Sequence, residues 1–526
     1  ATALLLTGCA TEVANSPRAA AVATPESYGA AGITVDGDRF PDAVANGEIR
    51  TTVDRTSTIS LDVDTASYSY ARRIILGEGR LPPPQSIRPE EWINYFDYPS
   101  YPSPAPGAAL QTASWVYQAP WQLDRAVIHI GAAAADPRFV ARTPQNLVVL
   151  ADVSGSMRGR DSVGLAGDVV RSLARLVSPE DQVAVVAFSG SAQTILPPTS
   201  GASPWAIEQA ADTLQAGGWT AGTRGLDHAY DLARRSARPG DTSRVIMVTD
   251  GVFNDGARTS EQLVDYVSDR RRSGVNLSVL GVSRGGLDDS ALQALAQAGN
   301  GEAAYLDDSI EAERVLSRLV EAGAPVARDA RLDVEFNPAF VRSWRLVGYE
   351  TREISRAEFF DPRTDAAEIR PGQTTTFIYE VALQPTSYES PEPGPYRYPG
   401  AAGTGADGTG FVQPYRNGTA NLSAGVNELA FVRLRYRDAA TGRMVEQRRP
   451  VTGYPRAQLA QMPTDIRFAA AVAMAAQAAR SDTGRPRQMA ELAESYAIGA
   501  LGNYPSGDRA EFLRIADRIT WLVPQR

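Results

Sequence analysis

Apolar and amphipathic segments alternate along residues 146–321. Four short apolar runs predict buried strands at residues 146–150, 182–188, 244–249 and 276–282. Apolar residues at helical spacing predict helices at residues 163–176, 204–214, 224–235, 260–272, 290–298 and 310–320. Such alternation is typical of a parallel sheet with helices on both faces. We therefore predict an α/β domain with a doubly wound parallel sheet, Rossmann-like in its layers, over residues 145–322.

Both flanks of this domain mix strand-like and helix-like patterns. Residues 58–144 predict a small α+β unit, with strands at 58–65, 112–117 and 125–130 and helices at 66–76 and 89–96. Residues 323–526 predict a C-terminal domain of strands followed by helices, with strands at 330–348, 374–383 and 428–437 and an Ala-rich helical part at 465–522. Within it, residues 385–427 are rich in Pro, Gly and Tyr and lack periodicity, which indicates disorder, a lightly packed loop or a partner-binding loop.

The charge and the choice of basic residues exclude several classes of function. The formal net charge is −9, which argues against nucleic acid as a partner because phosphate binding needs a basic face. The sequence holds no Lys, so P-loop and Schiff-base chemistry lack their required group. His129 and His228 have no His or Cys neighbour at ligand spacing, and we expect a strand residue and a helix-surface residue rather than a zinc site or a triad.

The amino-terminal residues carry the pattern of an export signal. An apolar run ends in Leu6-Thr7-Gly8-Cys9, which resembles the lipobox of bacterial lipoproteins. The resemblance implies that residues 1–9 are a signal remnant and that Cys9 is lipidated; Ala10 after it favours the outer over the inner membrane. An apolar tail with an ordinary Cys is the alternative. Residues 10–57, rich in Ala, Pro, Gly, Ser and Thr, predict a flexible tether.

Oxygen-bearing side chains follow the first strand of the α/β domain. Asp152, Ser154 and Ser156 come directly after the apolar run, and Asp250 follows the strand at 244–249. In open α/β sheets, ligands bind at the carboxyl ends of the strands. Carboxylate and hydroxyl oxygens suit Mg²⁺ most, with Mn²⁺ or Ca²⁺ also fitting. For the triplet alone, helix capping is the competing explanation.

This arrangement resembles the von Willebrand factor type A (VWA) domain and its metal-ion-dependent adhesion site. The resemblance implies five ligands to one divalent cation from three loops: Asp152, Ser154, Ser156, Thr220 and Asp250. Thr223 is the fallback for Thr220, because the second loop holds both. Trp219 in that loop departs from the small residue usual there, and either anchors a partner at the rim of the site or packs against a flank.

The flanks are similar to those of a bacterial family of VWA lipoproteins. The similarity rests on residues 60–70, 81–84 and 90–98 before the α/β domain, and on residues 348–352, 368–372 and 509–513 after it, in an uncharacterised C-terminal domain. Residues 385–427 are not recognised as a family feature.

Three of the five implied ligands are neutral hydroxyls, which leaves the metal electrophilic and open to a carboxylate from another protein. We therefore expect a lipoprotein of the bacterial envelope that binds a protein partner through this metal and contacts the membrane through its lipid alone. A structural subunit of an envelope assembly, with the metal as a local staple, is the runner-up. A metal-dependent hydrolase would need a base, and the motif loops offer no Lys, His or Cys. We expect no enzyme activity.

Overall fold

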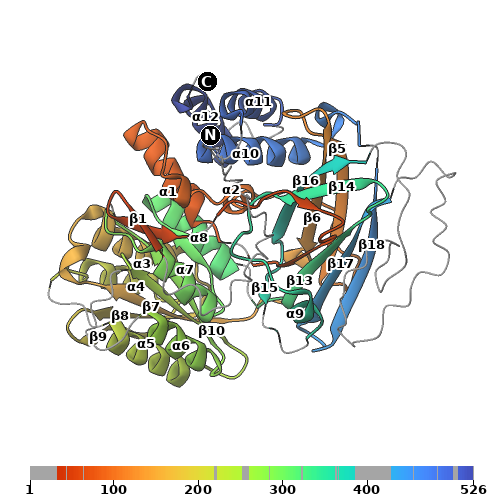
Figure 1. Cartoon of the computed structure of the whole chain (residues 1–526). Coiled ribbons are helices and arrows are strands. Elements are labelled where there is room, and N and C mark those ends of the chain that lie inside the picture. Colours follow the sequence, from red (N-terminus) through yellow and green to blue (C-terminus); the bar gives the residue numbers. More distant parts are fainter. Residues whose placement is uncertain are drawn as a thin grey trace, which may run out of the picture.

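The fold has three parts: an α/β domain, a β-sandwich beside it, and a layer of helices over both (Figure 1). The structure, a computed structural model, describes residues 32–42, 44–62, 64–217, 222–251, 260–283, 285–321, 324–361, 364, 366–384, 428–453, 455–481, 484–501 and 507–524.

The α/β domain is built on a sheet of six described strands. In spatial order they are β12 (Ala303–Tyr305), β11 (Val275–Gly281), β10 (Thr242–Thr249), β7 (Gln145–Asp152), β8 (Gln182–Phe188) and β9 (Ala192–Ser200). All neighbours are parallel except β9, which runs antiparallel to β8 at the edge. The strands were predicted apart from the short β12 and the edge strand β9.

Helices cover both faces of this sheet. One face packs against α3 (Leu165–Leu176), α4 (Pro204–Asp212) and α8 (Ser309–Glu321). The other packs against α5 (Gly222–Ser236), α6 (Ser260–Arg271) and α7 (Asp289–Ala298). The central strands are buried on both sides, so each reads as a continuous apolar run. The predicted doubly wound α/β fold is confirmed.

The two flanks share one β-sandwich instead of forming separate units. Its first sheet is β3 (Ile49–Arg50), β14 (Val341–Leu346), β16 (Thr374–Leu383), β6 (Arg125–Ala134) and β5 (Leu110–Gln118). Its second sheet is β15 (Ala367–Ile369), β13 (Ala327–Phe336), β17 (Glu428–Asp438) and β18 (Met444–Thr452), with β4 (Thr56–Ser60) also paired to β13. A single core fills the space between them. The short helix α9 (Arg356–Phe360) precedes β15. The predicted N-terminal and C-terminal flanking regions thus contribute strands to the same two sheets.

A helical layer covers the outer face of the first sandwich sheet. It consists of α10 (Thr464–Arg480), α11 (Pro486–Ile498) and α12 (Asp508–Leu522), together with α2 (Pro89–Ile93). Helix α1 (Ala66–Arg72) and its π-helical continuation Arg73–Glu78 lie between this layer and the α/β domain and contribute residues to the cores of both. Buried Arg72 joins three helices here: its guanidinium lies 3.1 Å from Glu311 of α8 and 2.9 Å from Glu511 of α12. Arg88 likewise pairs with Asp289 of α7 at 2.8 Å. These ion pairs tie the α/β domain to its flanks.

Part of the predicted tether is folded. Within residues 10–57, strands β1 (Gly32–Val35) and β2 (Asp38–Pro41) form a hairpin, and β3 joins the sandwich. The expectation of sparse structure is therefore wrong from residue 32 onward. Cys9 and the segment 385–427 lie outside the described residues. In the part that is described, no helix is long and apolar enough to cross a bilayer.

Candidate functional site

Asp152 ends β7 and lies fully buried at the carboxyl edge of the sheet. Its Oδ1 accepts the Ser154 backbone N–H at 2.8 Å, and its Oδ2 accepts the Thr249 hydroxyl at 3.0 Å. Strands β7 and β10 are parallel neighbours with Ala151 opposite Val248, so the next residue of each strand reaches the same edge. Two hydrogen bonds thus fix the orientation of the carboxylate.

Ser154 and Ser156 lie on the loop that leaves Asp152. Their Oγ atoms are 3.0 Å apart; Ser154 is buried and Ser156 is exposed. A one-turn 3₁₀ helix, Gly155–Met157, carries the loop, and the buried Met157 anchors it in the domain core. The two hydroxyls therefore converge between the interior and the surface, beside the Asp152 carboxylate.

Asp250 follows β10 at the same edge and is 2 % exposed. Its backbone oxygen accepts the Asp288 N–H at 3.2 Å. The next residue, Gly251, has φ +84°, and a Cβ there would lie 3.0 Å from the Asp288 oxygen, so the turn is both left-handed and crowded. The Gly251 N–H donates to Thr249 Oγ1 at 3.1 Å.

Thr249 is a site residue that the sequence analysis missed. Its hydroxyl joins the Asp152 carboxylate to the backbone of the Asp250 turn. The sequence places Thr249 next to Asp250 at the end of an apolar run, which could have indicated a role at the site. A β-branched residue is common in strands, however, so this position alone does not distinguish Thr249 from an ordinary strand residue.

Burial raises the pKa of Asp152 to about 6, and the neighbouring Asp250 carboxylate also raises it, while hydrogen bonds from Ser154 and Thr249 oppose the shift. A cation between the two carboxylates would favour their ionised forms. The donors present therefore fit a hard divalent ion, which Asp152, Ser154, Ser156 and Asp250 would hold. No three His, Cys, Asp or Glu side chains group as metal ligands in the described part, so such a site depends on hydroxyls as well.

Only the two ends of the second predicted loop belong to the described residues. Thr220 and Trp219 lie outside the described residues, and of Thr223 the backbone alone is described, in the first turn of α5. Their assignments as metal ligand, rim residue and fallback ligand stay predictions.

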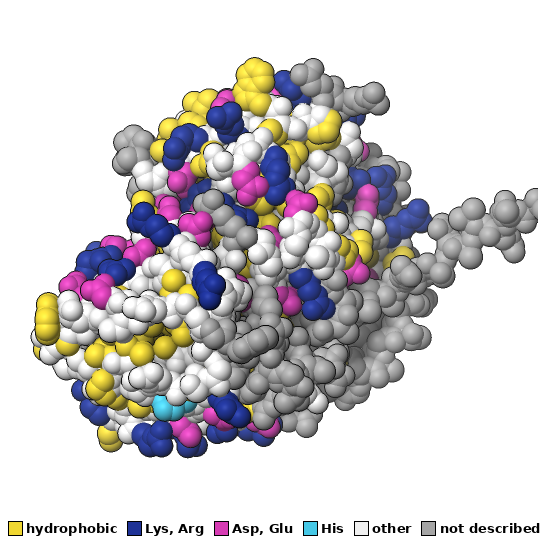
Figure 2. Space-filling view, turned by 90° about the vertical axis from the view of Figure 1, so that its left-hand side faces the viewer, with side chains coloured by type: hydrophobic (Ala, Val, Ile, Leu, Met, Phe, Trp, Pro, Cys, Tyr) yellow, Lys and Arg dark blue, Asp and Glu magenta, His cyan; other side chains and the backbone are white. Residues whose placement is uncertain are grey.

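Three exposed arginines flank the site. Arg158 and Arg160 follow Ser156 within four residues, and Arg224 lies in the first turn of α5, just after the second predicted loop. None of the three has an ion pair or hydrogen bond to another described residue. On the face shown in Figure 2, basic and acidic side chains are interspersed over the described surface.

Both histidines have structural partners. His129 is buried in β6, where its Nε2 lies 2.7 Å from the Tyr101 hydroxyl, and burial lowers its pKa to about 3. His228 on α5 lies 2.7 Å from the Thr194 hydroxyl. This confirms the expectation of a strand residue and a helix residue, and neither imidazole serves the candidate site as a base.

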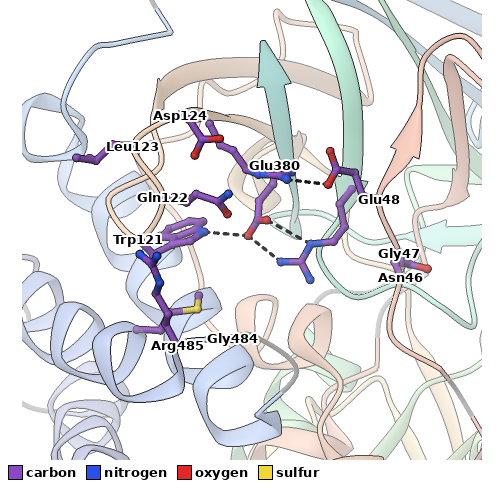
Figure 3. A pocket seen from close by; sticks show the side chains of 13 residues that line it. Asn46, Gly47, Glu48, Trp121, Gln122, Leu123, Asp124, Glu380, Gly484 and Arg485 are labelled. Carbon is purple, nitrogen blue, oxygen red and sulfur yellow. Dashed lines mark hydrogen bonds and ion pairs between the residues drawn. The ribbon is translucent and has the colours of Figure 1, made fainter. Parts of the chain in front are cut away.

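A cavity of about 720 Å³ opens in the flanks, where the turn between β5 and β6 meets α11 (Figure 3). Four of the charged side chains at its wall form two ion pairs. Glu380 lies 3.1 Å from Trp121 Nε1 and 2.8 Å from Arg345, and Glu48 lies 2.7 Å from Arg125. The cavity belongs to the sandwich and shares no residue with the candidate metal site.

Three protein-family models match the chain. They are the von Willebrand factor type A domain over residues 146–320, a model described as von Willebrand factor over residues 34–129, and the C-terminal part of the uncharacterized protein YfbK over residues 323–522.

Among curated proteins, the uncharacterized protein YfbK of Escherichia coli (strain K12) is 32% identical over 482 residues, which cover 88% of this chain and 78% of the relative. Similar solved structures include a von Willebrand factor type A protein from Catenulispora acidiphila (15% identity, 79% of this chain and 97% of that one, TM-score 0.39). Another is the ArnB paralog VWA2 from Sulfolobus acidocaldarius (12% identity, 78% and 97%, TM-score 0.36).

Proposed function

Since the chain belongs to the YfbK family of VWA-domain proteins, we propose that it binds a protein partner through a divalent cation, Mg²⁺ in the first place, held at the carboxyl edge of its α/β sheet. One observation carries the proposal: Asp152, Ser154, Ser156 and Asp250 come from two loops and meet at one edge, with hydrogen bonds that orient Asp152 for an ion.

The proposed partner supplies a carboxylate. The serine hydroxyls are neutral ligands, so the only negative charge next to the dication comes from Asp152 and Asp250. A cation with so few charged ligands can still attract a third carboxylate, supplied by the partner. Arg158, Arg160 and Arg224, which have no partner among the described residues, add positive charge near these loops in a chain whose formal net charge is −9. An acidic segment with more than one carboxylate would meet both the metal and these arginines, which favours its encounter and its orientation.

Binding is proposed in preference to catalysis. Hydrolysis at the metal would need a general base, and the sequence holds no Lys, while both histidines are engaged elsewhere. A purified protein that turned over esters or phosphates only with Mg²⁺ present would overturn this preference.

We also propose that the protein is anchored in the cell envelope, in the outer membrane, through lipid on Cys9. This rests on the Leu6-Thr7-Gly8-Cys9 pattern. Mass spectrometry of protein extracted from membranes tests it: a peptide with diacylglycerol and an acyl chain on Cys9 supports the anchor, and an unmodified Cys9 refutes it.

The functional test is crosslinking in intact cells followed by affinity capture with and without chelator. We expect partners whose capture is lost with EDTA and with Asp152→Ala, and weakened by the double change Arg158→Ala and Arg160→Ala. Asp212→Ala, which removes an exposed carboxylate on α4, is the matched control and should capture as the wild type does. Retention of every partner in chelator would contradict the proposal and favour a structural role for the metal.

A further inference from the structure

The β1–β2 hairpin docks against the loop that supports Asp250. Its turn residues Asp36 and Gly37 both have positive φ, the geometry that suits a two-residue hairpin. Asp38, at the start of β2, is 3 % exposed, and both of its carboxylate oxygens are engaged. Oδ1 accepts the Leu287 N–H at 2.9 Å, and Oδ2 accepts the Tyr70 hydroxyl at 2.8 Å.

Further contacts hold the hairpin to the same loop. The Arg39 N–H donates to the Leu287 oxygen at 2.7 Å, so Leu287 is bound through both its backbone groups. The Arg39 guanidinium lies 3.4 Å from the Asp288 carboxylate. Phe40 is buried in the core of the α/β domain, with its ring 5.3 Å from that of Tyr70.

The docked loop continues directly into the candidate metal edge. Asp288, next to Leu287, donates its N–H to the Asp250 oxygen at 3.2 Å, and its carboxylate caps α7 through the Ala291 N–H at 3.1 Å. Residue 251 must be Gly for this close approach, because a Cβ there would lie 3.0 Å from the Asp288 oxygen. A short run of hydrogen bonds thus leads from Asp38 through residues 287–288 to the backbone of Asp250.

We infer that Asp38 is a positioning residue for the metal edge and that docking of the β1–β2 hairpin raises the affinity of this edge for its cation. The inference rests on the proposed function, because it concerns the same metal. It adds that the amino-terminal segment and the metal are thermodynamically coupled, so metal binding must in turn tighten the hairpin.

Titration calorimetry of the full chain with Mn²⁺ alone tests this. In Asp38→Ala, residues 287–288 lose their carboxylate acceptor, and we expect Mn²⁺ affinity to fall about 10-fold, the lower end of effects seen when support to metal ligands is removed. Asp38→Asn keeps an acceptor oxygen for Leu287 and should bind within about 3-fold of wild type, a rescue that bulk destabilisation would not give.

Asp465→Ala is the matched control. Asp465 is also 3 % exposed and accepts two hydrogen bonds, from the Ser100 N–H at 2.8 Å and from Arg509 at 2.7 Å, but it lies in the helical layer. It should lose stability in urea without losing Mn²⁺ affinity. If Asp38→Ala does not fold, Arg39→Ala replaces it in the Mn²⁺ titration and should likewise lower the affinity, because it removes the contact with Asp288. The Arg39 side chain is one-third exposed, so this change removes fewer buried contacts.

The coupling has a second readout in the wild type. Mn²⁺ should slow amide hydrogen exchange at the Arg39 N–H, which bonds to Leu287. Unchanged exchange at Arg39, or a folded Asp38→Ala variant that binds Mn²⁺ as the wild type does, overturns the inference while leaving the metal site standing. A wild type that binds no Mn²⁺ instead refutes the proposed function itself.

Discussion

Thr249 offers a sharp test of how the candidate site is held together. Thr249→Val keeps the shape of this fully buried side chain and removes its hydroxyl. Two hydrogen bonds disappear: the one donated to Asp152 Oδ2 at 3.0 Å and the one accepted from the Gly251 N–H at 3.1 Å. The substitution therefore frees Asp152 and the turn after Asp250 at once, without changing a metal ligand.

The magnitude follows from these contacts. Removing a hydrogen-bond partner of a metal ligand costs about 10–100-fold in affinity, or about 1.4–2.7 kcal/mol. The buried Gly251 N–H, left without its acceptor, should lower the free energy of unfolding by about 1–3 kcal/mol. Both losses should appear together, because one hydroxyl serves both partners.

The assay is calorimetric titration of Mn²⁺ and Mg²⁺ into wild type, Thr249→Val and Thr249→Ser. Serine keeps the hydroxyl, so Thr249→Ser should bind within about 3-fold of wild type although it loses a buried methyl worth about 1 kcal/mol of stability. A folded Thr249→Val that binds both ions as tightly as wild type would refute the idea that the hydroxyl orients the metal edge.

Two further predictions concern buried charge. Burial raises the pKa of Glu90 to about 8, so the folded state binds the proton of this carboxyl group more tightly than the unfolded state does. The contribution of this proton to the free energy of unfolding is therefore present at acid pH and is lost as the pH rises through about 8. Relative to Glu90→Gln, wild type should lose about 3 kcal/mol of unfolding free energy between pH 5 and pH 8 in urea titrations; parallel curves would contradict this. Arg433 pairs with Asp333 at 2.6 Å and Glu335 at 2.7 Å, all three fully buried. Arg433→Met removes the guanidinium that lies between these two buried carboxylates and should cost about 3–5 kcal/mol, whereas a loss below about 1 kcal/mol would show that the ion pairs of Arg433 are not needed.

The sequence predicted the α/β domain well because its strands are buried on both faces. Continuous apolar runs then coincide with strands, and β8 has the bounds that were expected. The edge strand β9 escaped prediction because Pro197 and Pro198 interrupt its pattern, and an edge strand tolerates Pro where a central one does not.

The pattern of apolar residues does not show which strands pair when they are far apart in the sequence. The apolar run of β6 indicates a buried strand, but not that its partner β16 lies more than 200 residues away. The β1–β2 hairpin was missed for a related reason: strands of four residues give too little periodicity, and contacts made by Asp38 and Phe40 with the α/β domain hold them in place.

Some residues of the candidate site could be predicted from the local sequence, and one could not. Asp152, Ser154, Ser156 and Asp250 were predicted from their places after apolar runs, and the structure brings them to one edge. The role of Thr249 needed the register between β7 and β10, which no local pattern contains. Membership of the VWA family, first indicated by these motifs and by the flanks, is confirmed by the match to YfbK.

The most direct test of the central claim is titration calorimetry of Mg²⁺ and Mn²⁺ with the full chain, wild type against Asp152→Ala. Wild type should bind one ion, and Asp152→Ala should bind none while remaining folded, because the change removes a buried carboxylate at the centre of the site. The control Asp212→Ala should bind as wild type does. Equal affinity in wild type and Asp152→Ala would contradict the assignment of the metal to this edge of the sheet.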